Sequence, residues 1–254
     1  MKSDTYIPCD VLKPYVKSFV IEERIEKRAY KVFPHTGLVI GFQYKGRLWY
    51  LDDNVEVPLS VSGITGLRDT SRFFKSSPDI GTVLVFFKDA GAAAFFKEPM
   101  HLLFGESLSL DNFMLRSDLR ILEEQLCEAR QDTERIFIVE QFLISRMQGR
   151  EPDQLVLSAI EIIYKNKGNI RIGDMLPVLH ISQSPLEKRF RTVVGTSPKQ
   201  FASFVRFKHI LQSYVPGISL TSLGYEAGFY DQAHFIKEFK NLTGETPEHF
   251  FCTT

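Results

Sequence analysis

Short apolar runs separated by turn-forming residues fill the first third of the chain. The segments GLVIGFQYKGRLWYLD (37–52), VEVPLSVSGITG (55–66) and GTVLVFF (81–87) are rich in β-branched and aromatic residues, which favour strands. Lys45-Gly46 and Asp52-Asp53-Asn54 are typical of hairpin connections. We therefore expect residues 6–90 to be mainly strand and to form an antiparallel sandwich or a small barrel.

Farther along the chain, apolar residues recur at helical spacing. The segment DAGAAAFFKEP (89–99) predicts one short helix ended by its proline. Residues 116–148 place apolar side chains three or four positions apart, which predicts two helices joined near Gln131-Asp132. The polar segment 148–154 contains a glycine and a proline and is a candidate linker. Beyond it, the pattern predicts helices separated by glycines.

One pattern occurs twice in this last part of the chain. SQSPLEKRFRTVVGTSPKQF (182–201) and DQAHFIKEFKNLTGETPEHF (231–250) are identical at six of twenty aligned positions. The shared pairs are Gln183/Gln232, Lys188/Lys237, Phe190/Phe239, Gly195/Gly244, Pro198/Pro247 and Phe201/Phe250. Such self-similarity at a constant offset indicates an internal duplication.

Each copy predicts a pair of short helices. In the second helix of each pair, Leu186 and Phe190, or Phe235 and Phe239, lie four positions apart and share one face. The opposite face is polar and mostly basic, and a shorter apolar-periodic segment precedes each copy. Two helices joined by a turn of three or four residues, with an exposed basic second helix, form a helix-turn-helix unit. The chain is expected to contain two such units.

The segment between the copies, SPKQFASFVRFKHILQSYV (197–215), continues as one helical pattern. A helix of about twenty residues is about 30 Å long. Successive major-groove segments on one face of B-DNA lie about 34 Å apart, so this connector would hold two helices at neighbouring segments. A single helical hairpin would fit an ordinary bundle equally well, but the duplication favours a paired DNA-reading module.

The segment GFYDQAHFIKEFKNLTGETPEHF (228–250) resembles the signature of the AraC-type transcription regulators, and the resemblance covers residues 155–254. The β-rich part, at FPHTGLVIGF (33–42) and GAAAFF (91–96), resembles the cupin-like sensor half of some members. The resemblance implies an α+β chain in three parts. These are a β-rich sensor domain (1–110), a helical connector (111–150) and an all-α DNA-binding domain with two helix-turn-helix motifs (151–254).

The resemblance also implies which residues contact DNA. Base contacts fall at the start of each second helix, on Ser184, Glu187 and Lys188 in the first copy and on Gln232, Ala233, Ile236 and Lys237 in the second. The side-chain chemistry is suitable: lysine donates to guanine, glutamine pairs with adenine, glutamate accepts from cytosine, and isoleucine contacts the thymine methyl group. Arg191, Arg206 and Lys240 are placed for phosphate contacts.

Aromatic residues of the β-rich part are candidates to line a pocket for a small-molecule effector. They are Phe33, Phe42, Tyr44, Trp49 and Tyr50. Each of them also fits an ordinary core position, and none identifies a ligand.

The charge distribution leaves DNA binding open to an alternative. The chain has 31 basic and 31 acidic residues, and residues 151–254 hold 11 basic and 10 acidic ones, so bulk attraction to nucleic acid is absent. Between Ser184 and Ser213, however, six basic residues accompany one acidic residue. Pro177 interrupts the first helix of the first copy, where an interior proline costs about 3 kcal/mol, and predicts a kinked or late-starting helix. A degenerate relative that acts through protein contacts is therefore the alternative.

Enzymatic activity, cofactors and membrane insertion are not expected. Residues 1–150 contain only His35 and His101, too few for a metal site. The three cysteines, Cys9, Cys127 and Cys252, are scattered and lack the clustering seen in DNA-repair methyltransferases with a similar reader, so a fused cupin-like enzyme is the weakest alternative. No apolar run reaches the length of a membrane helix and no signal region begins the chain, so we expect a cytoplasmic protein. The helices at 116–148 serve dimerisation or brace the two parts, and a homodimer stays open.

Overall fold

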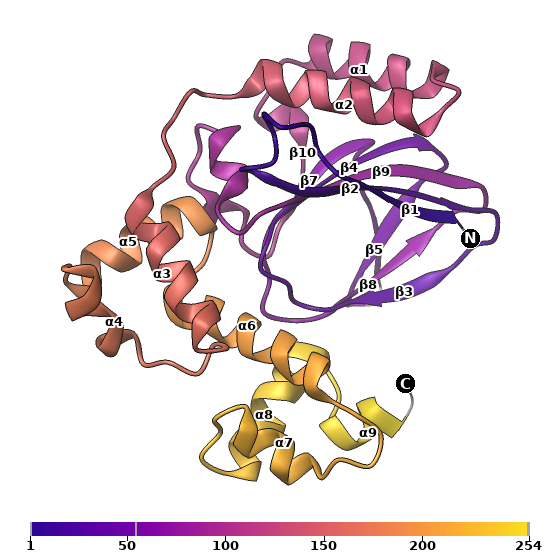
Figure 1. Cartoon of the computed structure of the whole chain (residues 1–254). Helices are drawn as coiled ribbons and strands as arrows, with labels where there is room; N and C mark the ends of the chain where they lie inside the picture. Colours follow the sequence, from indigo (N-terminus) through magenta and orange to yellow (C-terminus); the bar gives the residue numbers. More distant parts are fainter. Residues whose placement is uncertain (1, 54, 253–254) are drawn as a thin grey trace.

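A computed structural model describes residues 2–53 and 55–252 and shows a β-rich N-terminal part followed by helices (Figure 1). The strands are β1 (Lys2–Tyr6), β2 (Val16–Arg24), β3 (Ala29–Val32), β4 (Val39–Lys45), β5 (Leu48–Asp52), β6 (Val55–Pro58), β7 (Ser62–Thr65), β8 (Arg72–Ser76), β9 (Ile80–Phe87) and β10 (Ser107–Ser109). The predicted fold class, antiparallel sheet first and helix-turn-helix domain last, is confirmed.

The strands form two antiparallel sheets. The larger sheet has the order β1-β2-β9-β4-β7-β10, and the smaller has the order β3-β8-β5-β6. Side chains alternate between the two faces of each strand, so on β9 Val83, Val85 and Phe87 face away from Leu84 and Phe86. The first three are buried with at most 2% exposed, whereas the other two face a cavity between the sheets.

The two predicted hairpin turns have different outcomes. Asp53 has a left-handed backbone (φ 45) between β5 and β6, which pair antiparallel, so this hairpin is confirmed. Asn54 lies outside the described residues. Gly46 does make a turn (φ 68) after β4, but β4 and β5 belong to different sheets, so the predicted hairpin is wrong there. The reason is that β4 already pairs with β7 and β9 on its two edges.

Two helices, α1 (Arg116–Glu128) and α2 (Asp132–Arg146), cover the outer face of the larger sheet, as Figure 1 shows. They confirm the predicted helix pair. The ring of Phe142 on α2 packs edge-on against Phe42 of β4 at 6.1 Å. The alanine-rich segment forms a shorter element than predicted, the 3₁₀ helix η1 (Gly91–Ala94). The other 3₁₀ helices are η2 (Met100–Leu103) and η3 (Leu110–Asn112).

Residues 147–153 carry no helix or strand, and the helices of the C-terminal part follow them. These helices are α3 (Gln154–Lys165), α4 (Ile172–Leu179), α5 (Gln183–Val194), α6 (Pro198–Ser213), α7 (Leu220–Glu226), α8 (Gln232–Thr243) and α9 (Pro247–Cys252). The connector α6 has 16 residues and is therefore about 24 Å long, somewhat shorter than the sequence pattern predicts.

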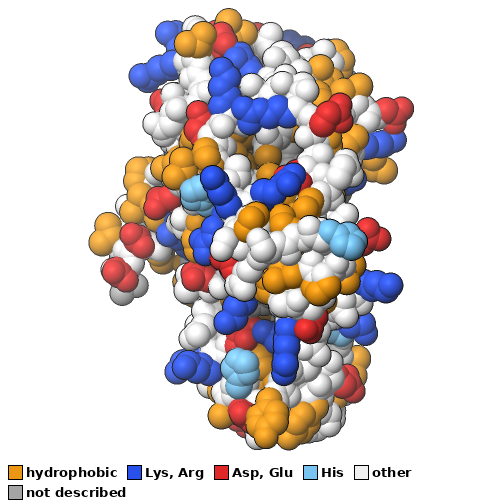
Figure 2. Space-filling view, turned by 90° about the vertical axis from the view of Figure 1, so that its left-hand side faces the viewer, with side chains coloured by type: hydrophobic (Ala, Val, Ile, Leu, Met, Phe, Trp, Pro, Cys, Tyr) orange, Lys and Arg blue, Asp and Glu red, His pale blue; other side chains and the backbone are white. Residues whose placement is uncertain are grey.

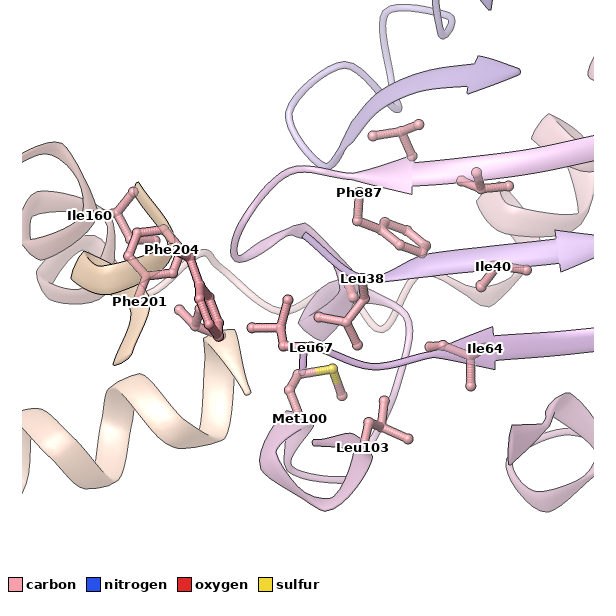
Figure 3. Packing of buried hydrophobic residues seen from close by; sticks show 14 of the residues in the cluster. Leu38, Ile40, Ile64, Leu67, Phe87, Met100, Leu103, Ile160, Phe201 and Phe204 are labelled. Carbon is pink, nitrogen blue, oxygen red and sulfur yellow. The ribbon is translucent and has the colours of Figure 1, made fainter. Parts of the chain in front are cut away.

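The β-rich and helical parts share one apolar core. Figure 3 shows Leu67 and Met100 of the β-rich part beside Phe201 and Phe204 of α6. Gly195, which ends α5 with φ 99, also lies here, and a Cβ at this position would be 3.1 Å from the carbonyl oxygen of Met100. The first helix-turn-helix unit is therefore packed directly on the N-terminal half.

Candidate nucleic-acid interface and interior cavity

The structure contains both expected pairs of helices. α4 and α5 are joined through His180, which adopts the left-handed conformation (φ 50). α7 and α8 are joined through Gly228, with φ 81. Left-handed residues reverse the chain within a short turn and end the preceding helix, so each pair has the compact geometry of a helix-turn-helix unit.

The duplicated Phe, Gly, Pro and Phe residues have the same structural roles in both units. Phe190 of α5 packs edge-on against Phe201 at 5.5 Å, and Phe239 of α8 packs edge-on against Phe250 at 5.3 Å. The intervening glycine ends the second helix in each copy, and the proline begins the next one. The repeat therefore encodes two copies of one small core.

The predicted base-contacting side chains lie on the outer faces of α5 and α8. Ser184, Lys188, Gln232, Ala233 and Lys237 are exposed, and Glu187 and Ile236 are partly exposed. Gln183 donates a hydrogen bond to Glu187 (Nε2 to Oε1, 2.8 Å). The ammonium groups of Lys188 and Lys237 make no hydrogen bond or ion pair within the described part of the chain. Both lysines are thus available to an external acceptor.

The predicted phosphate contacts fall into two groups. Arg191 and Lys240 are exposed in the last turns of α5 and α8. Arg206 is instead engaged inside the protein, because its Nη2 contacts both carboxylate oxygens of Glu238 at 2.9 and 3.1 Å. Its guanidinium also stacks over the ring of Phe229 at 4.5 Å. Arg206 therefore ties α6 to α8 and is not free for a phosphate in this arrangement.

Two polar contacts that were not predicted from the sequence hold α5 and α8 in place. Arg189 of α5 forms two hydrogen bonds with Asp153 (2.9 and 3.0 Å), which also caps the start of α3. Asp231 caps α8 by accepting from the backbone N–H of His234 at 2.7 Å. The position of Asp231 directly before a helical pattern was a usable signal, whereas the pairing of Arg189 across 36 residues had none.

Pro177 lies inside α4, as expected from the sequence, but α4 does not start late. The helix begins at Ile172 and continues through Pro177 to Leu179. The proline ring crowds the carbonyl four residues earlier, and that residue is Gly173, around which nothing lies within 4 Å of a Cβ position.

On the face of the molecule shown in Figure 2, basic side chains do not form one continuous surface. Figure 2 shows the side of the molecule from which α4 and α5 project, and there lysines and arginines alternate with acidic and apolar side chains. This distribution agrees with the nearly balanced charge of residues 151–254. Any DNA contact must therefore come from specific side chains rather than from a broad basic field.

A cavity of about 210 Å³ lies between the two sheets. Its lining is mainly apolar, including Val32, Leu48, Phe74, Leu84 and Phe86. Polar groups also line it, among them Glu22, His35, Gln43 and Thr82. Burial lowers the pKa of His35, which favours the neutral imidazole. A cavity of this kind suits a small, largely apolar molecule with a few hydrogen-bonding groups.

The five aromatic residues predicted to line an effector pocket are not among the residues that line this cavity. Phe42 and Tyr44 lie on the opposite face of β4, where they pack against Phe142 and Arg135 of α2. Trp49 alternates with the cavity residue Leu48 and so faces outward.

The other two aromatics do not line the cavity either, although Tyr50 is two residues from the lining residue Leu48 and so lies on the same side of β5. Phe33 contacts Phe250 of α9 with ring centroids 5.2 Å apart. Tyr50 lies under the guanidinium of Arg72 at 4.1 Å. The structure therefore does not bring the five predicted side chains together around one cavity.

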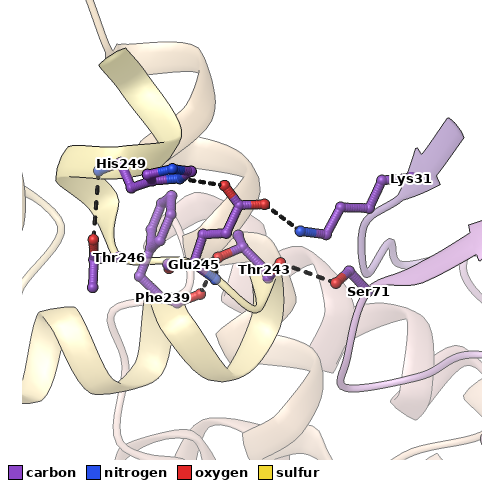
Figure 4. Close-up of polar contacts among 7 residues, drawn as sticks. All are labelled: Lys31, Ser71, Phe239, Thr243, Glu245, Thr246 and His249. Carbon is purple, nitrogen blue, oxygen red and sulfur yellow. Dashed lines mark hydrogen bonds and ion pairs between the residues drawn. The ribbon is translucent and has the colours of Figure 1, made fainter. Parts of the chain in front are cut away.

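The second helix-turn-helix unit is docked on the smaller sheet (Figure 4). Lys31 of β3 forms an ion pair with Glu245, which also accepts from His249 at 2.8 Å. Ser71 donates a hydrogen bond to the carbonyl oxygen of Thr243 at 3.0 Å. These contacts involve the C-terminal end of α8 and the segment after it, so they leave the start of α8 uncovered.

Neither a membrane-spanning helix nor a metal-binding cluster occurs in the described part of the chain. Across residues 2–53 and 55–252, no helix is long and apolar enough to cross a membrane. The same residues contain no group of three or more His, Cys, Asp or Glu side chains that could hold a metal ion.

Comparison with known families and curated proteins separates the two halves of the chain. Residues 177–252 match a family described as a helix-turn-helix domain, and residues 4–109 match a domain of unknown function. The lactose operon transcription activator of Staphylococcus xylosus is 28% identical over 98 residues, which are 36% of this chain. The chain thus spans about a third of the length of this relative (35%).

Solved structures with a similar course of the chain are more distant. ToxT from Vibrio cholerae has a TM-score of 0.48 at 12% identity, covering 98% of this chain and 97% of that one. ToxT of strain SCE256 bound to an unsaturated fatty acid has a TM-score of 0.45 at 15% identity (93% and 95% covered). The AraC-like transcriptional activator CuxR has a TM-score of 0.29 at 17% identity (80% and 79% covered). Similarity at this level supports no transfer of function or ligand. The family match and the duplicated helix pairs agree that the segment 177–252 is a helix-turn-helix domain.

Proposed function

We propose that this protein is a cytoplasmic transcription regulator that binds double-stranded DNA sequence-specifically through α5 and α8. The observation that carries the proposal is the presence of two helix-turn-helix units in one domain, each with its second helix exposed along its outer face. Packing within an ordinary helical bundle does not require two exposed helix faces with matching side chains. A duplex, in contrast, offers matching groove segments at regular spacing.

The chemistry of the exposed side chains supports base reading. Lys188 and Lys237 occupy equivalent positions in the repeat, and neither ammonium has a partner in the described chain. Each can donate to O6 and N7 of guanine. On α8, Gln232 can pair with adenine, and Ile236 can contact the methyl group of thymine. Arg191 and Lys240, near the ends of the same helices, are suited to the flanking phosphates.

The connector α6 sets the spacing between the two readers. Its length of about 24 Å, together with the widths of the units at its ends, is compatible with neighbouring groove segments about 34 Å apart. One chain can therefore contact two successive segments without a partner. Dimerisation of the chain would double the length of the site.

We infer further that the cavity between the sheets receives a small-molecule effector. Strand β3 connects this cavity to the DNA-binding part, because its residues alternate between two faces. Tyr30 and Val32 line the cavity, whereas Lys31 contacts Glu245 and Phe33 contacts Phe250. A molecule that shifted β3 would therefore alter the docking of the second helix-turn-helix unit.

The test of DNA binding is a selection of bound sites from random duplex DNA with the full chain. The proposal predicts an enriched site with two conserved blocks about one helical turn apart. It also predicts retention on DNA that weakens with rising salt, because phosphate contacts release counterions. Recovery of no enriched sequence would favour the alternative, a relative that acts through protein contacts.

The effector is tested separately by thermal unfolding of the chain with a library of metabolites. A ligand that binds only the folded state raises the melting temperature. A substitution that fills the cavity, Gly41→Leu, should abolish this rise, whereas Gly173→Ala, in the open surface of α4, should not. A rise that Gly41→Leu leaves intact would place the ligand elsewhere.

A further inference from the structure

Two arginines close to the residues that line the interior cavity, although not themselves part of its lining, lack a counter-ion. Arg68 lies in the connection between β7 and β8 and has only 7% of its surface exposed. Its one hydrogen bond in the described chain runs from Nη2 to the carbonyl oxygen of Gly105, at 3.1 Å. A guanidinium has five N–H donors, so most of the binding capacity of Arg68 is unused.

Arg72, at the start of β8, is the second member of this pair. Its guanidinium lies over the ring of Tyr50 at 4.1 Å, and its Nη1 is buried with no hydrogen-bond partner. Neither arginine forms an ion pair with any acidic side chain among residues 2–53 and 55–252. Glu106 and Asp52 influence the charge of Arg68 from a distance, but both are exposed.

The guanidinium of Arg68 remains charged at neutral pH. Burial, together with the neighbouring charge of Arg72, lowers the pKa of Arg68 to about 10. A buried charge without a partner is costly, and a second positive charge beside it adds to the cost. Natural proteins keep such an arrangement where an anion neutralises it, since arginine binds carboxylate and phosphate with two parallel hydrogen bonds.

The register of the strands places Arg72 beside residues that line the cavity. Arg72 is two residues from Phe74 and directly opposite Val32 on β3, and both of those residues line the cavity. Side chains two apart share a strand face, so Arg72 is on the cavity side of the smaller sheet. The charge of Arg68 contributes, after burial, to the lowered pKa of His35, another lining residue.

We propose that Arg68 and Arg72 form a binding site for an anionic group, a carboxylate or a phosphate, beside the cavity between the sheets. The proposal depends on the unpaired guanidiniums and is independent of DNA binding. It would hold as an anion site even if the chain bound no DNA.

The test uses the full chain and two probes, inorganic phosphate and acetate, each compared with sodium chloride at equal ionic strength. Calorimetric titration should show saturable binding of at least one probe. At ten times the dissociation constant, the melting temperature should rise by about 3 °C. A stronger response to phosphate assigns a phosphate-bearing ligand, and a stronger response to acetate assigns a carboxylate. A response to neither anion beyond that to chloride overturns the proposal.

Arginine variants locate the site. Arg68→Gln and Arg72→Gln should each weaken binding of the effective probe at least about fivefold, because each removes a charged donor pair. Arg47→Gln is the matched control, since Arg47 is an exposed arginine of the same β-rich part that donates to the carbonyl of Gly46. Unchanged binding in both Arg68→Gln and Arg72→Gln overturns the proposal.

The unliganded variants separate a binding role from a structural one. In chloride alone, Arg68→Gln should melt at or above the temperature of the parent chain, because it removes an uncompensated buried charge. An arginine whose role is to hold the connection to Gly105 would show a lower melting temperature and unchanged anion binding, which contradicts the site. Arg68→Lys, which keeps the charge, should retain part of the binding.

Discussion

Lys31 of β3 and Glu245, 214 residues later in the chain, form an ion pair that joins the smaller sheet to the segment between α8 and α9. Glu245 also accepts a hydrogen bond from His249. The hydrogen bond from Lys31, followed by the one from His249, lowers the pKa of the Glu245 carboxyl below its ordinary value. This contact is the main polar attachment of the second helix-turn-helix unit, together with Ser71 and the carbonyl of Thr243.

Replacing Glu245 by glutamine should loosen this attachment. A partly exposed ion pair contributes at most about 1 kcal/mol, so the chain stays folded while α9 and the preceding turn open more often. Hydrogen exchange of the peptide covering residues 243–252 should accelerate at pH 7. Asp79→Asn, which breaks the Lys45–Asp79 pair (2.6 Å) inside the β-rich part, should leave that peptide unchanged. Equal exchange in the parent and Glu245→Gln chains would contradict a role for the pair in docking.

The same pair gives the docked state a pH dependence of known sign. Because the folded-state pKa of Glu245 is depressed, its contribution is present above the ordinary glutamate pKa of about 4.3. It is lost as the pH falls through the folded value. The difference in exchange between the parent chain and Glu245→Gln should therefore shrink on acidification below about pH 4. A difference that grew on acidification would contradict this assignment.

The raised pKa of the Asp89 carboxyl predicts a pH dependence of stability whose sign is opposite to that of Glu245. This carboxyl follows β9 and lies near the hydroxyls of Thr36 and Tyr164, which are themselves 3.2 Å apart. Burial raises the pKa of Asp89, and the two hydroxyls only partly oppose that effect. A carboxyl whose pKa is raised by folding stabilises the fold at pH values below its unfolded-state pKa. This contribution is lost as the pH rises through its folded-state pKa.

Asp89→Asn mimics the protonated form and should increase stability at neutral pH, with a smaller gain in acid. Urea unfolding at pH 5 and pH 8 measures this difference. Asp111→Asn, at an exposed position in η3, is the control and should show the same small effect at both pH values. If Asp89→Asn destabilised the chain equally at both pH values, the carboxylate would be needed as a hydrogen-bond acceptor in its ionised form.

The repeat shows how much of the site could be predicted from the sequence. Gly195 and Gly244 both end their helices with positive φ, at 99 and 81, and the phenylalanines six positions later pack on equivalent partners. Because these roles depend on local geometry and on helical spacing, the identity of the residues was enough to predict them. The exposed positions on α5 and α8 followed from the same spacing.

The cavity and the docking contacts could not be predicted in this way. Both faces of β4 are covered, one by α2 and one by the smaller sheet, so apolar residues occur on both faces and alternation does not reveal the cavity side. For this reason the sequence predicts Phe42 as a pocket residue, although its ring packs against Phe142. The partner of Arg206 is Glu238, 32 residues away, and no local pattern distinguishes an internal ion pair from a free phosphate contact.

The two repeats differ in their helix caps, and this difference can be measured. Asp231 accepts from the backbone of His234 at 2.7 Å, whereas Ser182 at the equivalent position makes no side-chain cap bond. Asp231→Ala should lower the free energy of unfolding by about 1 kcal/mol. Ser182→Ala should change it by less than about 0.5 kcal/mol. Equal losses in urea unfolding would mean that the cap of α8 contributes nothing specific.

Arg206 and Arg191 should separate stability from DNA affinity. Arg206→Ala removes the two contacts to Glu238 and leaves a largely buried carboxylate, so it should cost about 2 kcal/mol of stability. Arg206→Lys should recover only part, since lysine cannot make the bidentate contact.

Arg191→Ala, at an exposed position, should leave stability within about 0.5 kcal/mol. It should weaken DNA binding on all sequences and reduce the salt slope by about one. Urea unfolding and binding isotherms at several salt concentrations measure both effects. A stable Arg206→Ala chain with reduced DNA affinity would mean that Arg206 leaves Glu238 when DNA binds.

Lys188 and Lys237 provide the sharpest test of base reading because the duplication makes them internal controls for each other. Lys188→Ala and Lys237→Ala should each cost about 1 to 3 kcal/mol on the best selected site and relax one base position. The two relaxed positions should lie in different blocks of the site, about one helical turn apart. Lys27→Ala, at an exposed lysine between β2 and β3, should alter neither affinity nor preference. A uniform loss on every sequence would reassign these lysines to phosphates, since only a base contact distinguishes one sequence from another. Relaxation of the same block by both variants would show that α5 and α8 do not read separate segments.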